Sequence, residues 1–382
     1  MKYKLSDICE YAKGKIKVSA LDENTYISTE NMLPNKGGIT KAASLPTQEQ
    51  TQAFMKNDVL VSNIRPYFKK IWYATFDGGC SNDVLVFRAK GGVSSRFLHY
   101  VLADDTFFDY SMATSKGTKM PRGDKKAIME YEVPELSYED QCKIAGILEV
   151  IDEKIELNTD INKNLEVQAQ ALYREMFVNT TNEQRRTCRA EEYFDIAIGK
   201  TPPRKERQWF TTNPSDVIWI SISDMGSCGT YISRSSEQLT QEAIDKFNIK
   251  VVPSNTVLLS FKLTVGRIAI THGEMTTNEA IAHFKTDKSF INEYLYCYLK
   301  DFNYQTMGST SSIAIAVNSK IIKAMPFVIP ADDEISRFHS VAGPMFEQIL
   351  NNQLENDSLA EIRDALLPRL MSGELDVSSL DI

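Results

Sequence analysis

Two stretches of the sequence repeat one pattern of apolar and polar residues. Residues 57–86 read "NDVLVSNIRPYFKKIWYATFDGGCSNDVLV", and residues 255–282 read "NTVLLSFKLTVGRIAITHGEMTTNEAIA". Each begins with an apolar run of strand length, passes through a loop that contains Lys or Arg, and continues into further apolar runs. At an offset of 197, Arg65 aligns with Lys262, Lys70 with Arg267 and Ile71 with Ile268. The chain therefore repeats a frame of strands and changes the loops between them.

The repeat extends over most of the chain. "RFLHYVL" (96–102) aligns with "EYLYCYL" (293–299), Pro134 with Pro330, and "LEVQAQALYREMF" (165–177) with "LAEIRDALLPRLM" (359–371). A period near 195 residues is too long for a solenoid and indicates the tandem duplication of a whole domain with its tail. We expect a first domain over 1–134, a helix over 135–178, a second domain over 179–330, and a second helix with a tail over 331–382.

Each half has an α+β pattern. Alternating short apolar runs predict strands over 58–62, 70–75 and 83–89 in the first half and over 217–222, 256–261, 267–271 and 280–284 in the second. Amphipathic helices are expected near 95–110 and 291–304.

Each half then ends in one long helix. The first has an apolar stripe from Ile144 through Ile161 to Met176, and Ser137 with Asp140 forms a capping-box pattern before it. The second has a matching stripe from Phe338 through Ile362 to Leu370, after an acidic start that suits a helix N-terminus. Two stripes of equal length predict that the helices bury each other as a coiled-coil pair.

Asn158 and Asn352 interrupt the two stripes at matched positions, 194 residues apart. A polar side chain in such a contact lowers stability but fixes the register of the helices. The alternative is that both side chains face solvent. The sequence leaves both interpretations open.

Composition describes a protein without membrane spans or disulfides. No apolar run approaches the ~18 residues that a membrane span needs, and the N-terminus lacks the apolar core of a signal peptide. The six cysteines form no CxxC pair, which indicates reduced thiols and a cytoplasmic location. The net charge of −8 is uneven, because residues 135–177 carry −6 and residues 331–382 carry −8. The remaining blocks are therefore basic, which suits a nucleic-acid partner.

Signatures of catalysis are missing from the sequence. There is no glycine-rich phosphate loop, no Asn/Asp-Pro-Pro-Tyr/Phe segment of the kind that amino-methylating enzymes use, and no Gly-x-Ser-x-Gly. The four histidines have no metal-ligand spacing. Asp152-Glu153-Lys154 is better explained as a solvated helix face than as a nuclease site. We expect no catalysis, no bound metal and no cofactor on this chain.

The basic loops are the candidate DNA contacts. Readers of DNA use Lys and Arg on phosphates, and Arg, Asn, Gln, Ser or Thr on base edges. The alternative for any one of these residues is an ordinary solvated loop. The candidates are Lys13, Lys15, Arg65, Tyr67, Lys69, Lys70, Lys116, Thr118, Lys119, Arg122, Lys200, Thr201, Arg204, Lys205, Trp209, Lys262, Arg267, Ser309 and Thr310. Because Arg65/Lys262 and Lys70/Arg267 recur in both halves, we expect them to hold phosphates. Base discrimination is expected in the divergent loops around Lys116–Arg122 and Thr201–Trp209.

Four stretches together resemble the specificity subunits of Type I restriction–modification systems. They are "GTKMPRGDKKAIMEYEVPELSYEDQCKIAGILEVID" (117–152), "GKTPPRKERQWF" (199–210), "VLLSFKLTVGRIAI" (257–270) and "LLPRLMSGELDV" (366–377). The resemblance covers nearly the whole chain. The first domain departs from it at "KGKIKVSALDENTY", which lacks the Thr-Pro that follows Gly199-Lys200.

The resemblance implies two target recognition domains and two long helices that pack antiparallel in a pseudo-twofold arrangement. Each domain would read one half of a split target in double-stranded DNA. The helices would bind methyltransferase subunits and, through them, restriction/translocase subunits. S-adenosylmethionine, ATP and Mg²⁺ would belong to those partners. Two alternatives are a self-sufficient restriction–methylation enzyme, which the missing signatures disfavour, and a duplicated scaffold that binds protein or glycan.

Overall fold

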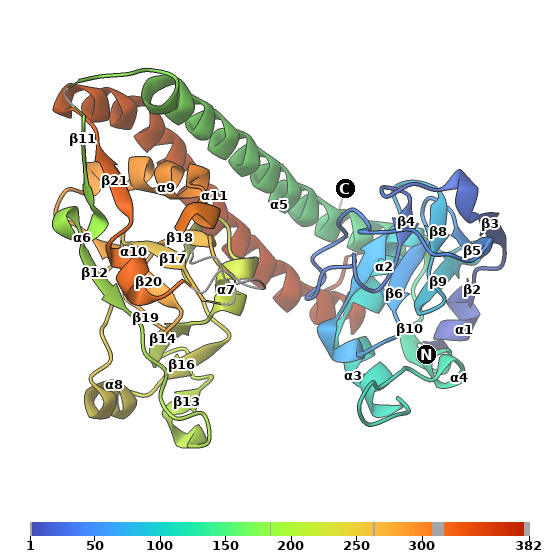
Figure 1. Cartoon of the computed structure of the whole chain (residues 1–382). Coiled ribbons are helices and arrows are strands. Elements are labelled where there is room, and N and C mark those ends of the chain that lie inside the picture. Colours follow the sequence, from blue (N-terminus) through green and yellow to red (C-terminus); the bar gives the residue numbers. More distant parts are fainter. Residues whose placement is uncertain (1, 184, 263, 308–316, 378–382) are drawn as a thin grey trace. The chain divides into compact units, whose positions relative to one another are not determined.

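The computed structural model describes residues 2–183, 185–262, 264–307 and 317–377, and it divides into two compact units (Figure 1). Unit 1 comprises Met1–Lys154 and Ser358–Ile382, and unit 2 comprises Ile155–Asp357. Each unit consists of one β-rich domain and a segment of each of two long helices. The unit boundaries thus fall within the helices, whereas the sequence placed its divisions at the helix ends.

Unit 1 is built on two four-stranded sheets and a two-stranded ribbon. One sheet has the order β2-β9-β6-β7, the other has the order β3-β5-β8-β4, and β1 pairs with β10. The strands are β1 (Lys2–Lys4), β2 (Cys9–Tyr11), β3 (Lys15–Lys17), β4 (Tyr26–Ile27), β5 (Gln50–Phe54), β6 (Val59–Ser62), β7 (Ile71–Tyr73), β8 (Gly78–Cys80), β9 (Val84–Ala89) and β10 (Glu132–Pro134). The short helices are α1 (Leu5–Ile8), α2 (Ser95–Ala103), α3 (Asp105–Ala113) and α4 (Lys125–Ile128).

Unit 2 has a five-stranded sheet, a four-stranded sheet and a ribbon. Their orders are β12-β20-β17-β18-β15, β13-β16-β14-β19 and β11-β21. The strands are β11 (Arg186–Arg189), β12 (Asp195–Ile198), β13 (Phe210–Thr211), β14 (Val217–Ile220), β15 (Tyr231–Ile232), β16 (Glu237–Leu239), β17 (Val257–Ser260), β18 (Ile268–Thr271), β19 (Thr276–Thr277), β20 (Ile281–Lys285) and β21 (Pro326–Ile329). The short helices are α6 (Ala190–Tyr193), α7 (Ile222–Ser227), α8 (Gln241–Phe247), α9 (Asn292–Asp301) and α10 (Ser319–Lys323).

The repeated frame seen in the sequence is a repeated sheet. In unit 1, β6 pairs antiparallel with β7 and β9, and Val59 lies opposite Phe87. In unit 2, β17 pairs antiparallel with β18 and β20, and Val257 lies opposite Phe284. The expected strands are confirmed at both places.

The expectation of one continuous helix over 95–110 is wrong. Asp104 has extended backbone angles, and its side chain accepts from the Thr106 N–H and so caps a second helix, α3.

The structure shows a second repeated element, a strand followed by a turn, which the sequence comparison did not identify. "YISTENM" (26–32) and "WISISDM" (219–225) take the same place, since β4 runs parallel to β8 and β14 runs parallel to β19. In each, the side chain three residues after the first Ser accepts a hydrogen bond from the backbone N–H of that Ser: Asn31 from Ser28 at 2.6 Å, and Asp224 from Ser221 at 2.8 Å. This shared turn positions two basic side chains discussed below.

The long helices are α5 (Tyr138–Tyr173), which continues into a five-residue π-helix at Arg174–Val178, and α11 (Asp332–Met371). Ser137 caps the start of α5, because its Oγ accepts from the Asp140 N–H, and the same hydroxyl donates to the Asp140 carboxylate. At the start of α11 the Glu334 carboxylate accepts from the Ala331 N–H.

The two helices are antiparallel within each unit. In unit 1, Arg363 Nη1 of α11 contacts Asp152 Oδ1 of α5 at 2.8 Å. In unit 2, Asn352 of α11 contacts Asn162 of α5, so that residue numbers rise along one helix as they fall along the other. The core of unit 1 joins Leu98 of α2 to Leu148 of α5 and Leu367 of α11. The core of unit 2 correspondingly joins Leu295 of α9 to Ala169 of α5 and Phe338 of α11.

Four asparagines form a polar layer between α5 and α11 in unit 2, two of them buried. Asn158 Nδ2 donates to Asn356 Oδ1 at 2.9 Å, and Asn352 Nδ2 donates to Asn162 Oδ1 at 2.8 Å. Asn158 and Asn352 are only 1% and 5% exposed, which excludes the interpretation that they face solvent.

This layer has the symmetry of the repeat. Asn158 is 194 residues before Asn352 and Asn162 is 194 before Asn356, so the two amide contacts are equivalent. One further pair of hydrogen bonds follows the same rule, because Asn162 donates to the Ile349 carbonyl and Asn356 donates to the Ile155 carbonyl, both at 3.3 Å. The sequence identified Asn158 and Asn352 but placed Ile161 in the stripe. Ile161 is 37% exposed, and Asn162 takes the inward position.

No helix within residues 2–183, 185–262, 264–307 and 317–377 is long and apolar enough to cross a membrane.

The asparagine layer predicts a non-additive pair of substitutions. Asn352→Leu should lower the free energy of unfolding by about 1–3 kcal/mol, because the Asn162 and Gln348 amides lose their partner in a buried place. Asn352→Leu leaves the Asn162 amide without its partner, and adding Asn162→Leu removes that amide. The double variant should therefore be more stable than the sum of the two single effects predicts, by roughly 0.5–3 kcal/mol. Denaturant unfolding measures all three variants.

The control is Asn164→Leu, an exposed position on the same helix, which should change stability by less than about 0.5 kcal/mol. Strictly additive effects of Asn352→Leu and Asn162→Leu would show that the layer is not coupled.

Candidate nucleic-acid interface

Two basic loops of unit 1 lie edge to edge, although about fifty residues separate them in the sequence. The Arg65 N–H donates to the Pro121 carbonyl at 2.8 Å, and the Gly123 N–H donates to the Asn63 carbonyl at 3.2 Å. Lys116 and Arg122 exchange two backbone hydrogen bonds of 2.9 Å, which closes the second loop on itself. The fold thus gathers the candidates of 65–70 and 116–122 into one surface.

The charges on this surface are loosely paired. Lys116 Nζ contacts Asp124 Oδ2 at 2.5 Å, and this hydrogen bond lowers the pKa of Asp124 to about 2. Arg122 Nη2 contacts Asp83 at 3.1 Å. The Lys116 side chain is 81% exposed and that of Arg122 is 56% exposed. Exposed pairs of this kind contribute less than about 1 kcal/mol, so both cations can exchange a carboxylate for a phosphate.

Lys69 and Lys36 share one carboxylate at the other edge of the same surface. Their ammonium groups lie 2.8 Å and 3.0 Å from the two oxygens of Asp105. Partial burial raises the pKa of Asp105, but the two lysines outweigh it, and the pKa lies below its usual value. Lys69 has a left-handed backbone (φ 49°), as has Arg65 (φ 50°), which turns the chain around Pro66–Phe68 and exposes Tyr67.

Lys70 and Arg267, which the sequence matched as phosphate contacts, make the same internal contact instead. Lys70 Nζ donates to the Thr29 carbonyl at 2.6 Å, and Arg267 Nη1 donates to the Ile222 carbonyl. Thr29 and Ile222 are equivalent residues of the repeated turn at 26–32 and 219–225. Burial lowers the pKa of the Lys70 ammonium, as expected for a cation drawn inward. Both side chains hold a turn in place, which explains why the repeat keeps a cation there.

In unit 2 the divergent loop centres on Arg204. Its guanidinium lies 4.2 Å from the Phe210 ring centroid and 4.4 Å from that of Trp219. Arg204 Nη1 also donates to both carboxylate oxygens of Glu237, at 2.9 and 2.7 Å. Arg204 and Glu237 line an open pocket of about 700 Å³ together with Arg207. Aromatic contacts and one carboxylate orient Arg204, whose side chain is still 49% exposed.

Trp209 is a correction to the sequence interpretation. It is only 4% exposed, it packs with Leu239 and Ile244, and Nε1 donates to Glu206. Lys246 covers one face of its ring at 4.3 Å. The aromatic ring belongs to the core of unit 2 and has no free face for a base.

The remaining candidates are distributed as follows. Lys200 donates to the Phe247 carbonyl at 2.6 Å, and Thr201 is hydrogen-bonded to Glu279. Ser309 and Thr310 lie outside the described residues. The exposed candidates are Lys13, Lys15, Thr118, Lys119, Lys205 and Lys262.

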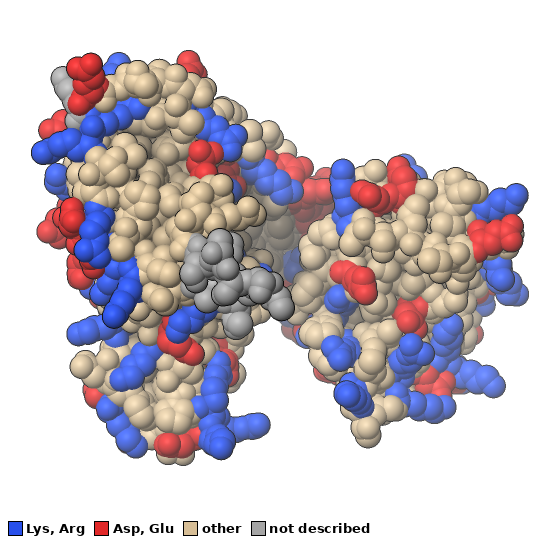
Figure 2. Space-filling model, in the orientation of Figure 1, with Lys and Arg blue, Asp and Glu red and all other residues tan. Residues whose placement is uncertain are grey.

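Lys and Arg are numerous at the lower end of each unit in the view of Figure 2, although unit 2 also carries them along its upper part and outer edge. In unit 1 this end carries α4 and the loop that precedes it, and in unit 2 it carries α8 and β13 (Figure 1). Within the described residues, no group of three His, Cys, Asp or Glu side chains is arranged to hold a metal ion. The arrangement suits binding of a polyanion.

Sequence reasoning missed several partners of these cations. Lys36, Asp105 and Glu237 belong to the two surfaces but lie far from the candidates in sequence. The sequence contained no signal for them. A signal did exist for Lys70 and Arg267, since aligning 26–32 with 219–225 would have shown that both units keep the turn to which these side chains bind.

The fold and its two basic surfaces define a duplicated DNA-recognition protein. The family model "Type I restriction modification DNA specificity domain" matches residues 1–167 and 183–363. The chain therefore belongs to the Type I restriction–modification specificity subunits, the non-catalytic subunits that supply the DNA target specificity of these complexes. In this family the cofactors belong to the methyltransferase and restriction subunits.

Individual relatives agree with this assignment. The chain is 25% identical to the Type I restriction enzyme HindI specificity subunit of Haemophilus influenzae, over 98% of this chain and 99% of that one. It is 27% identical to the MjaIX specificity subunit of Methanocaldococcus jannaschii, over 76% and 71%. The crystal structure of a Type-I restriction-modification system S subunit from M. genitalium shares the fold, with a TM-score of 0.54 at 15% identity over 97% of this chain and 96% of that one.

The internal contact of Arg267 predicts a loss of stability and not of DNA contact. Arg267→Ala should lower the free energy of unfolding by about 1–3 kcal/mol, because the Ile222 carbonyl loses a charged donor in a partly buried place. DNA affinity of the folded fraction should not change. Lys262→Ala, at an exposed position nearby in sequence, is the matched control for stability and should shift it by less than about 0.5 kcal/mol. Arg267→Ala with normal stability and weakened DNA binding would restore the phosphate role.

Proposed function

We propose that this chain recognises a bipartite target in double-stranded DNA, with the basic surface of each unit contacting one half-site. The observation that carries the proposal is the joining of two basic loops in unit 1 by backbone hydrogen bonds between Arg65 and Pro121 and between Gly123 and Asn63. A flexible lysine-rich loop would bind any polyanion. A loop fixed at both edges holds its side chains at defined positions, which sequence-specific binding requires.

The two surfaces support different tasks for their cations. In unit 1, Lys116, Lys119 and Arg122 are exposed, and the ion pairs of Lys116 and Arg122 are weak, which suits phosphate contacts. In unit 2, Arg204 is held by Phe210, Trp219 and Glu237, which suits the fixed geometry that an arginine needs to read a guanine edge. We assign phosphate binding to the first group and base reading to Arg204.

The helices α5 and α11 complete the proposal. They would determine the separation of the half-sites and bind methyltransferase subunits, which in turn would recruit the restriction/translocase subunits. Their negative charge supports a protein partner over DNA, because residues 135–177 and 331–382 together carry −14. A scaffold for protein or glycan has no support in the structure, since such a partner gives no reason for lysine-rich surfaces fixed in this way.

Phosphate contacts predict a uniform loss of DNA affinity. Lys116→Ala and Lys119→Ala should each weaken binding of target and non-target DNA to a similar degree, because phosphates carry no sequence information. Each should also reduce the slope of log K against log salt by roughly one. Binding titrations of the chain with its methyltransferase subunit at several salt concentrations measure both effects.

Lys163→Ala, an exposed lysine on α5, removes the same charge away from the loop and is the control. A loss confined to one DNA sequence after Lys116→Ala or Lys119→Ala would assign these lysines to base reading instead.

The modular reading of the target predicts the outcome of a segment exchange. Replacing residues 1–134 by the equivalent segment of another specificity subunit should change one half of the methylated motif and leave the other half intact. Exchanging residues 179–330 should change the opposite half. The methylated motifs are read from the genomic DNA of cells that express each chimera with the methyltransferase. A change in both halves after either exchange would refute the assignment of one half-site to each unit.

A further inference from the structure

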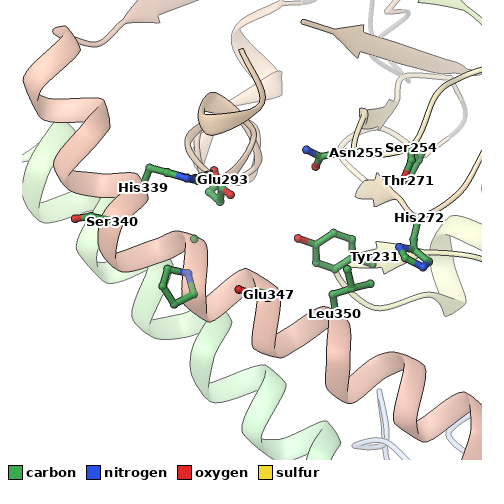
Figure 3. Close-up of a pocket in the computed structure, with 12 residues that line it drawn as sticks. Tyr231, Ser254, Asn255, Thr271, His272, Glu293, His339, Ser340, Glu347 and Leu350 are labelled. Carbon is green, nitrogen blue, oxygen red and sulfur yellow. Dashed lines mark hydrogen bonds and ion pairs between the residues drawn. The ribbon is translucent and has the colours of Figure 1, made fainter. Parts of the chain in front are cut away.

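Unit 2 contains a second pocket, away from the basic loops, between α11 and the β domain (Figure 3). It has a volume of about 560 Å³. Its walls include Glu293 of α9, Tyr231 of β15, and His339 and Glu347 of α11. Figure 3 shows Tyr231 projecting into the space between α11 and the loops that carry Asn255 and His272.

The pocket is acidic. Among the described residues that line it, two are glutamates and none is Lys or Arg. The Glu293 side chain is 13% exposed, and its carboxylate lies 3.2 Å from His339 Nδ1. Burial raises the pKa of Glu293 in spite of this contact. The carboxylate therefore lacks a partner that fully compensates for its lost hydration, and a phosphate backbone is excluded as a ligand.

Unit 1 shows what fills the equivalent place there. Arg96 aligns with Glu293 at an offset of 197, and Glu149 aligns with Gly343 at an offset of 194. In unit 1, Arg96 Nη2 contacts Glu149 Oε1 at 2.7 Å, and its guanidinium lies 3.9 Å from the Tyr73 ring centroid. In unit 2 the arginine is replaced by a carboxylate, and the helix residue that would face it has no side chain. The frame thus accepts a guanidinium at this place, and unit 2 does not supply one.

Pro344 and Gly343 give the α11 wall of the pocket two unusual features. Pro344 has no N–H, so the carbonyl of Ser340 lacks its usual donor within α11, and both residues line the pocket. The imidazole of His339 lies close to Gly343, since a Cβ there would lie 3.1 Å from the ring. A guanidinium carries five N–H donors and binds over aromatic rings, so it suits a pocket that is lined by two carboxylates and a tyrosine.

We propose that this pocket receives an arginine side chain of the methyltransferase subunit, so that Glu293 and Glu347 form an anchor for that partner. The inference rests on the proposed assembly with a methyltransferase. It adds a defined point of attachment in unit 2 that has no counterpart in unit 1, where Arg96 of the chain itself occupies the place. Glu293 and Glu347 act in partner binding and take no part in DNA reading.

The test uses the full chain and the purified methyltransferase subunit. Glu347→Gln and the double variant Glu293→Gln/Glu347→Gln remove charge and keep shape. The double variant should weaken the association by about tenfold or more, because a guanidinium in the pocket would lose its carboxylates. Glu347 is exposed, so the single variant should fold normally and still weaken the association, by a smaller factor. Calorimetry at fixed pH and salt measures the affinities.

Glu153→Gln is the matched control, because Glu153 of α5 is the repeat equivalent of Glu347 and is also exposed. It should leave the affinity within about twofold of the parent. Unchanged affinity in the double variant would overturn the inference, as would an equal loss in Glu153→Gln, which would indicate general charge attraction.

The motif methylated in cells separates this inference from the proposed function. At saturating expression, the Glu347→Gln complex should methylate the same bipartite motif as the parent. If the parent complex itself methylates no bipartite motif, the proposed function fails whatever the affinities show. If the parent methylates the motif and the Gln variants bind the methyltransferase normally, only the pocket assignment fails.

Discussion

The amide layer between α5 and α11 is the constraint on which the architecture depends. Leu and Ile side chains along two long helices are nearly interchangeable, so an apolar contact alone permits sliding by a turn or a heptad. Asn158 and Asn352 do not permit it, because a shifted helix would bury their amides against aliphatic groups at a cost of about 1–3 kcal/mol each. In unit 2 the same helices enter the domain core through Ala169 and Phe338, so the register also fixes where the β domain sits on its helices.

The sequence predicted the parts of the fold that depend on periodicity. Strand alternation located β6 and β17, and the helical period located α5 and α11, because burial of one face imposes these patterns directly. The sequence prediction was wrong or incomplete where the contacts of a single side chain determine the local structure. Asp104 breaks the expected helix by capping a second one. Alignment showed that Lys70 and Arg267 are equivalent but not that they point inward, since direction depends on a turn whose carbonyls become visible only in the fold.

The two units keep one framework and use charge differently on it. Lys70 and Arg267 stabilise the framework, because their side chains point inward and donate to backbone carbonyls. Lys116 and Arg122 are exposed and form only weak ion pairs with carboxylates. A basic residue that recurs in a duplicated domain is therefore more informative about the shared fold than about the shared ligand. The differences between the repeats, including Glu293 in place of Arg96, mark the places where each unit has acquired its own contacts.

The symmetry of the amide layer makes the helix contact self-complementary. Asn158 of the first repeat donates to Asn356 of the second, and Asn352 of the second repeat donates in the same way to Asn162 of the first. Such a contact is isologous in the sense used for homodimers. A gene holding a single repeat would therefore encode every amide needed to pair with another copy of itself. Its two reading surfaces would be identical, and the DNA it selected would be a palindrome, so the fused chain is the form that allows an asymmetric target.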